Sequence, residues 1–101
     1  NRLLDPWARK IQSNYWFMLG ERMRVYGERQ AALNAYERAA AIAFDSRTVQ
    51  FNVGLMMLRL GELAKAEQHA EAALSIDPFQ RQTLALLARI YRELGRSEDV
   101  Q

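Results

Sequence analysis

The residues that could do chemistry are few in this chain. The only histidine, His69, lies between Glu67 and Glu71, and the sequence contains no cysteine. A zinc site needs several His or Cys ligands, and none can be assembled here. Glu67 and Glu71 would share a helix face with Lys65 nearby, which is typical of a solvated surface rather than of an acid/base pair. We therefore expect no enzymatic activity, no cofactor and no metal, with His69 on a helix surface.

The feature that organises the chain is a period of 34 residues. Gly27, Gly61 and Gly95 are spaced at this interval, and each follows an amphipathic run. Glycine suits the end of a helix, where a left-handed backbone conformation is needed. The same offset relates Leu19 to Val53 and Leu87, Gly20 to Gly54 and Ala88, Ala32 to Ala66 and Val100, Ala39 to Ala73, and Ile42 to Ile76. A fixed period of this length indicates stacked units that bury their apolar faces against one another.

The repeated pattern resembles the tetratricopeptide repeat (TPR), W-x2-L-G-x2-Y followed by A-x3-F and P. Three copies carry it: Trp16, Leu19, Gly20, Met23, Ala32 and Tyr36; then Val53, Gly54, Met57, Ala66, Ala70, Ala73 and Pro78; then Leu84, Leu87, Ala88 and Tyr91. The resemblance implies an all-α fold, a right-handed α-solenoid of antiparallel helix pairs. Repeats are expected at 13–46 and 47–80, with an incomplete third at 81–101. Phe44, Gln50 and Ala70 depart from the pattern, so we expect looser packing in the middle repeat.

Caps and breakers predict where the helices begin and end. Asp5-Pro6 is a good helix start, and no breaker follows before Gly27. We expect one helix from Pro6 to Tyr26, in which residues 1–12 extend the first repeat helix; the alternative is a separate short helix from a preceding unit. Further helices are expected at 28–43, 48–60, 62–76 and 80–94, with another beginning at Ser97. Gly20 is expected to face Ala32, and Gly54 to face Ala66, at the closest helix crossings.

The ends of the chain suggest a part of a longer protein. It opens with Asn1 rather than Met, and the last repeat lacks its second helix and a capping helix. We expect Leu84, Leu87, Ile90 and Tyr91 to be partly uncovered, which favours homo-oligomerisation through this helix or a missing segment.

Charge and hydropathy exclude two classes of partner. A net charge of +2 is too small to indicate nucleic-acid binding. The longest apolar runs, at 39–44 and 53–58, are too short for membrane insertion. Neither feature fixes a compartment, and cytoplasm and periplasm are both compatible.

The resemblance also implies a concave groove lined by the first helix of each repeat. Carried over position by position, its lining would be Asn14, Phe17, Glu21, Arg24 and Val25; Thr48, Phe51, Leu55, Leu58 and Arg59; and Gln82, Ala85, Arg89, Arg92 and Glu93. An apolar strip bordered by arginines suits a peptide of a partner protein that carries large apolar residues and acids. Two alternatives stay open: Phe17 and Phe51 pack between units and the arginines are solvated, or the chain is a structural or assembly segment of a larger protein.

One branch of the family binds the C-terminal carboxylate of chaperone tails. Asn52 matches one position of that site. The other positions, where Lys, Asn, Lys and Arg are expected, hold Phe17, Glu21, Gln82 and Leu86. The sequence therefore argues against chaperone-tail binding.

Overall fold

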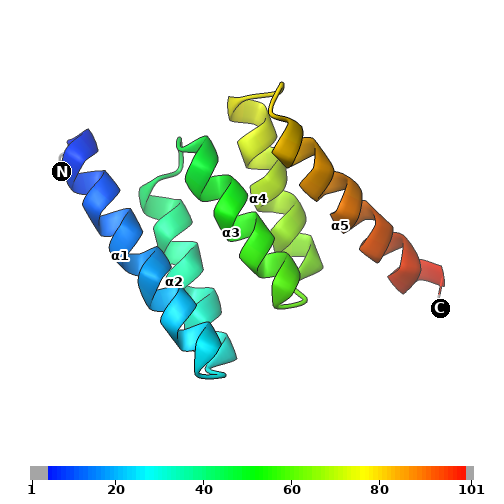
Figure 1. Cartoon of the computed structure of the whole chain (residues 1–101), viewed down its shortest axis with the longest axis horizontal. Coiled ribbons are helices and arrows are strands. Elements are labelled where there is room, and N and C mark those ends of the chain that lie inside the picture. Colours follow the sequence, from blue (N-terminus) through cyan, green and yellow to red (C-terminus); the bar gives the residue numbers. More distant parts are fainter. Residues whose placement is uncertain (1–4, 100–101) are drawn as a thin grey trace. The chain divides into compact units, whose positions relative to one another are not determined.

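The computed structural model describes the backbone of residues 5–99 and the side chains of residues 5–95 (Figure 1). This part of the chain forms α-helices and no strand: α1 (Pro6–Val25), α2 (Arg29–Ile42), α3 (Arg47–Arg59), α4 (Leu63–Ile76) and α5 (Arg81–Asp99). The all-α fold class is confirmed. The helices belong to two compact units: Asn1–Phe44 holds α1 and α2, and Asp45–Gln101 holds α3, α4 and α5.

The first helix starts where its cap predicts. Asp5 Oδ1 accepts a hydrogen bond from the Ala8 amide at 2.8 Å, and Pro6 occupies the first turn. This bond satisfies one of the backbone amides at the helix start that lack a partner within the helix. Pro6 has no amide proton, so it leaves no donor unsatisfied there. α1 then continues to Val25 without a break, so the alternative of a separate short helix is wrong.

Two of the three periodic glycines end a helix. Gly27 and Gly61 have φ values of 78° and 81°. The amide after each glycine donates a hydrogen bond to a carbonyl of the preceding helical turn. Glu28 donates to the Met23 carbonyl at 2.8 Å, and Glu62 donates to the Met57 carbonyl at 2.9 Å. This is the Schellman arrangement, in which a left-handed residue satisfies the last helix carbonyls.

The predicted helix end at Gly95 and a new helix at Ser97 are wrong. α5 runs through Gly95 to Asp99, and the residues after Gly95 include no proline that would stop it. Glycine inside a helix costs only about 1 kcal/mol, which a continuing helix tolerates. Val100, included in the sequence alignment of repeats, lies outside the described residues.

In the first unit, α2 packs on α1 through a face of small residues and one tyrosine. Tyr36 and Ala39 are fully buried, and the buried Ser13 hydroxyl donates to the Ala39 carbonyl at 3.2 Å. A Cβ built on Gly20 would lie 2.7 Å from two ring carbons of Tyr36. The three nearest atoms all belong to the Tyr36 ring, which occupies the space beside Gly20. The expected approach of Gly20 to Ala32 stays a prediction.

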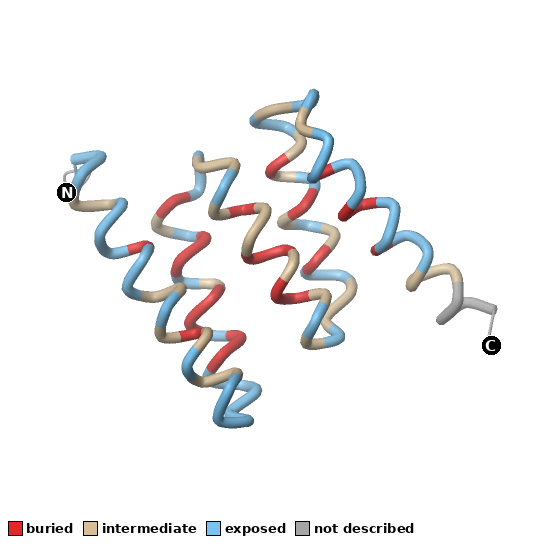
Figure 2. The backbone as a smooth tube through the Cα atoms, viewed as in Figure 1, coloured by how far each residue is buried: buried red, intermediate tan, exposed pale blue. Residues whose placement is uncertain are grey.

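In the second unit, α3 crosses α4 with backbone against backbone. A Cβ on Gly54 would lie 3.2 Å from the Ala70 amide nitrogen and 3.4 Å from the Ala66 carbonyl oxygen. The expected approach of Gly54 to Ala66 is confirmed, and Ala70 comes closer still. Both alanines are fully buried, and Figure 2 shows several buried segments along α4 in red.

α5 is less exposed than the sequence predicts. Leu87 and Ile90 are 5% and 0% exposed, so the expectation that they are uncovered is wrong. They are buried because they share a helix face with Leu86, and α5 packs on α4. Leu84 and Tyr91 lie off this face and are 48% and 47% exposed, as expected.

Gln50, a polar residue that departs from the repeat pattern, has a hydrogen-bond partner inside the second unit. Gln50 is buried, and its Oε1 lies 2.9 Å from Nδ1 of His69. His69 is thus half-buried and bonded across the helix pair, which corrects its expected place on a helix surface. Buried polar groups of this kind are tolerated when they are hydrogen-bonded.

We predict that Gly54→Leu lowers the melting temperature by several degrees. Because the Ala70 backbone cannot yield as a side chain can, the helices must separate, at roughly 1–3 kcal/mol. Thermal unfolding followed by circular dichroism measures this. Gly95→Ala is the control, since a Cβ there meets no atom within 4 Å, and an unchanged melt for both variants would contradict the close crossing.

Candidate peptide-binding faces of α1, α3 and α5

The candidate residues of α1 lie around Tyr36. Phe17 is half-buried, and its ring centroid lies 5.3 Å from that of Tyr36. Glu21 and Arg24 are partly exposed on the same helix, whereas Asn14 is exposed and outside this group. Tyr36 was not among the residues that sequence reasoning selected for binding, although its place in the A-x3-aromatic pattern signals that it faces α1.

Glu21, Arg24 and Tyr36 form a hydrogen-bonded network. Arg24 Nη2 lies 2.8 Å from Glu21 Oε1 in a salt bridge, and Tyr36 donates its hydroxyl proton to Glu21 Oε2 at 2.5 Å. Arg24 Nε donates to the Tyr36 hydroxyl at 3.3 Å. Glu21 and Arg24 are therefore fixed by each other and by Tyr36, so neither presents a free charge to a ligand.

The surroundings of Tyr36 raise the pKa of its hydroxyl. Burial first, and then the hydrogen bond to Glu21, raise the pKa of Tyr36 to about 12. Burial favours the neutral phenol because the charged phenolate loses its hydration. The Glu21 carboxylate favours it as well, because ionisation would place a second negative charge beside it.

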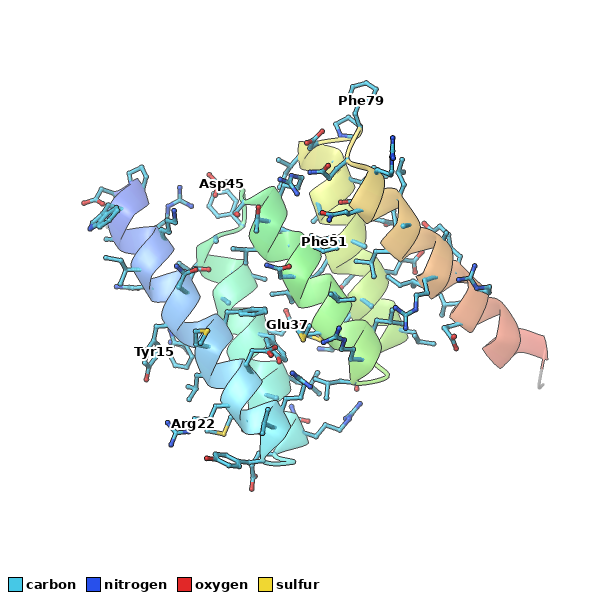
Figure 3. All side chains as sticks on the ribbon, in the orientation of Figure 1. Tyr15, Arg22, Glu37, Asp45, Phe51 and Phe79 are labelled. Atoms are coloured by element: carbon cyan, nitrogen blue, oxygen red, sulfur yellow. The ribbon has the colours of Figure 1, made fainter. Side chains whose placement is uncertain are left out.

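In the second unit, the candidate residues of α3 divide into a half-buried row and two exposed residues at opposite ends of the helix. Phe51, Asn52, Leu55 and Leu58 are half-buried, and Thr48 and Arg59 are exposed. Arg89 and Arg92 are exposed on α5. Figure 3 marks the place of Phe51 on α3.

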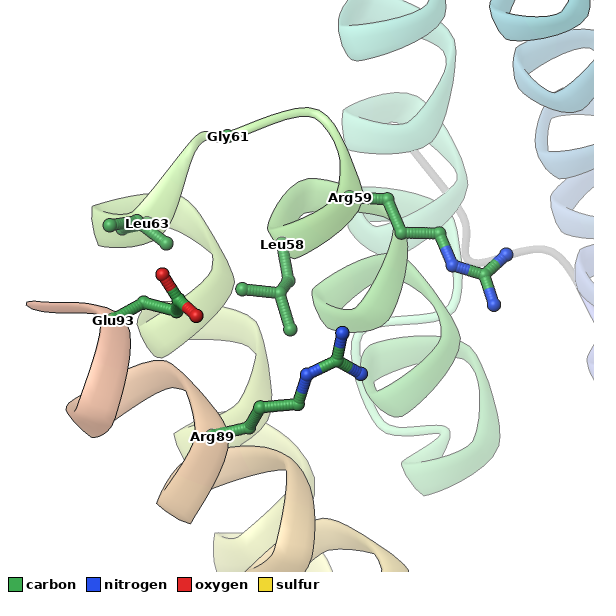
Figure 4. Close-up of a pocket in the computed structure, with 6 residues that line it drawn as sticks. All are labelled: Leu58, Arg59, Gly61, Leu63, Arg89 and Glu93. Carbon is green, nitrogen blue, oxygen red and sulfur yellow. The ribbon is translucent and has the colours of Figure 1, made fainter.

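A cleft at one end of this unit brings three of these residues together. It has a volume of about 350 Å³ and is lined by Leu58, Arg59, Gly61, Leu63, Arg89 and Glu93 (Figure 4). The turn at Gly61 and the first residue of α4, Leu63, were not selected from the sequence, although a turn between the paired helices signals their place. Thr48, Phe51, Asn52, Leu55 and Arg92 do not line it.

The cleft combines an apolar lining with two guanidinium groups and the Glu93 carboxylate. Leu58 and Leu63 supply the apolar surface, and in Figure 4 Arg89 extends toward Leu58 while Arg59 extends away from it. Neither arginine forms a salt bridge with the side chains described in residues 5–95. Guanidinium groups bind carboxylates through paired hydrogen bonds, so an acid next to an apolar side chain suits this lining.

The described residues carry neither a metal-ligand cluster nor a membrane-spanning helix. They contain no group of three or more His, Cys, Asp or Glu that could hold a metal ion. None of their helices combines the length and apolar character needed to cross a membrane.

Comparison with known proteins gives matches in structure and none in sequence families. No protein-family model and no curated protein match the chain. The crystal structure of MamA superposes with a TM-score of 0.69 and 26% identity over 83% of this chain. The second TPR of Spaghetti (RPAP3), bound to the HSP90 peptide SRMEEVD, superposes with a TM-score of 0.70 and 19% identity, covering 88% of this chain and 84% of that one.

The chain has a tetratricopeptide-repeat fold. The resemblance drawn from the 34-residue period is thus confirmed in three dimensions. This chain covers 49% of the length of the MamA chain. The repeat boundaries at 46/47 and 80/81 remain a prediction.

We predict that one tyrosine of this TPR chain ionises near pH 12. A folded-state pKa above the usual value means that the network's contribution to stability is complete below about pH 10 and is lost as the pH rises toward 12. Tyrosinate absorbance against pH, with circular dichroism to follow unfolding, measures this. The hydrogen bond to Glu71 also raises the pKa of Tyr91, so the comparison is made in a Tyr91→Phe background. There Tyr36→Phe should remove the titration near pH 12 and Tyr15→Phe should leave it; titration near pH 12 in Tyr36→Phe/Tyr91→Phe would contradict the assignment.

Proposed function

We propose that this TPR chain is a non-catalytic interaction module that binds a peptide segment of a partner protein through the first-helix faces of its repeats. The TPR-like fold supports a role in protein–protein interaction, and one of the similar structures is a TPR bound to a peptide. The observation that carries the proposal is the cleft in the second unit, where Leu58 and Leu63 lie beside Arg59 and Arg89.

The composition of the cleft defines the ligand. A large aliphatic side chain would cover Leu58 and Leu63, and removing that area from water supplies affinity. An acidic neighbour would pair with Arg89, the guanidinium that extends toward Leu58. Aromatic residues and arginine are the usual energetic anchors of such interfaces, and the half-buried Phe51 on α3 extends the candidate surface.

The chaperone-tail peptide fits this surface poorly. Leu86 stands where the carboxylate-binding site of that family branch has a base, and it is only 5% exposed. Glu21 stands at another of these positions and is bonded to Tyr36 and Arg24. We expect SRMEEVD, the peptide of the RPAP3 complex, to bind with a Kd above about 10 μM, or weaker than roughly −7 kcal/mol.

The direct test uses short fluorescent peptides with one Leu flanked by two Glu, and matched peptides with Gln in place of Glu. We predict that the chain prefers the Glu peptide and that Arg89→Gln weakens its binding about ten-fold, the change expected from one lost charged pair worth about 1.4 kcal/mol. Fluorescence anisotropy measures the Kd.

The matched control is Arg81→Gln, an exposed arginine of α5 that does not line the cleft. If Arg81→Gln and Arg89→Gln weaken binding equally, the effect comes from net charge and the proposed site is wrong. Equal affinity for the Glu and Gln peptides would also contradict it.

The alternative function is assembly, and the exposed side chains of Leu84 and Tyr91 on α5 favour it. Light scattering over a range of concentrations separates the two. A dimer that dissociates in the Leu84→Glu variant would support self-association through α5. A monomer at all concentrations would favour the peptide-binding module.

A further inference from the structure

α1 has a second apolar face that no described residue covers. Its members are largely exposed: Trp7 (72%), Ile11 (53%), Tyr15 (61%), Met18 (66%), Val25 (71%) and the C-cap residue Tyr26 (66%). The first four recur every three or four residues, and Val25 follows Met18 by seven. On an α-helix this spacing places them in one row. We call this row the outer stripe of α1.

The outer stripe is distinct from the face that packs on α2. The residues of α1 that α2 covers include Ser13 and Gly20, both buried. Figure 3 shows the side chains of Tyr15 and Arg22 on the side of α1 that is away from α2. Since a solvent-facing helix surface is normally polar, a row of six large apolar side chains along the whole helix indicates a docking surface.

A single cation lies within the row. Arg22 follows Met18 by four residues and precedes Val25 by three, and its guanidinium lies 5.8 Å from the centre of the Tyr26 ring. The acids of the described part of α1 and its cap are engaged elsewhere: Asp5 accepts from the Ala8 amide, and Glu21 bonds Arg24 and Tyr36. An occupant that covers the row must therefore bring its own carboxylate to Arg22, because burying an unpaired charge is costly.

A second copy of the chain does not meet this requirement. Parallel pairing of two outer stripes would bring Arg22 against Arg22. Antiparallel pairing about the middle of α1 would bring Arg22 level with the Arg9 and Lys10 segment of the other copy, which holds two cations. Neither arrangement supplies an acid, and both place like charges together.

We infer that the outer stripe of α1 docks an amphipathic helix of a partner protein, with apolar residues at positions i, i+4 and i+7 and a Glu or Asp that meets Arg22. This surface is separate from the peptide-binding cleft, because the stripe belongs to the first unit and the cleft to the second. Docking of an apolar helix face in this way is a common recognition mode, in which the apolar row gives affinity and the charged residue fixes the register.

The test uses two synthetic helical peptides with the same Leu face, one with Glu and one with Lys at the position that meets Arg22. The chain should bind the Glu peptide about ten-fold more tightly, by isothermal titration calorimetry. Arg22→Glu should reverse this preference, and Tyr15→Ser with Met18→Ser should abolish binding of both peptides. Phe79→Ser is the matched control, because Phe79 is 90% exposed but lies outside the stripe.

Three results would overturn the inference: no binding of either peptide, equal binding of both, or Arg22→Glu keeping the wild-type preference. A dimer that dissociates in the Met18→Glu variant would also overturn it, since a second copy of the chain would then cover the outer stripe. Arg89→Gln should leave the helical peptides bound as before, so that failure of the cleft and failure of the outer stripe give different results.

Discussion

The structure depends on how closely paired helices approach at glycine. At Gly54 a Cβ would lie 3.2 Å from a backbone nitrogen of α4, and at Gly20 it would lie 2.7 Å from the Tyr36 ring. Neither helix pair could close to this distance around a larger residue. The pairs in turn place the first-helix faces, because a helix fixed on one side presents a defined row of side chains on the other.

The two units fill the space beside the glycine in different ways, and this gives their surfaces different chemistry. In the first unit Tyr36 fills it and extends its hydroxyl to Glu21, so the charged groups of α1 beside Tyr36 are bonded to each other. In the second unit Ala70 lets the backbones meet, and Gln50 bonds His69 instead. In the second unit Arg59 and Arg89 therefore stay out of such a network, whereas Arg47 pairs with Asp77. This difference is why the proposed peptide site lies there.

Much of this fold could be predicted from the sequence, because spacing alone encodes it. The period located the paired helices and the turns at Gly27 and Gly61. It could not separate these from Gly95, since the residue type is the same and only its backbone conformation differs. Likewise, the sequence identified Arg89 and Leu58 as surface residues, but a cleft depends on tertiary packing that no local pattern contains. The helical spacing of the apolar residues in the outer stripe is present in the sequence, but only burial shows which apolar face of α1 remains uncovered.

Proton NMR tests the close crossing most directly. The structure predicts nuclear Overhauser contacts from the Gly54 α protons to the Ala70 amide proton. It also predicts that the Gly20 α protons are shifted by the ring current of Tyr36, and that this shift disappears in Tyr36→Leu. Glycine α protons with ordinary shifts, and no contacts from Gly54 to α4, would contradict the account.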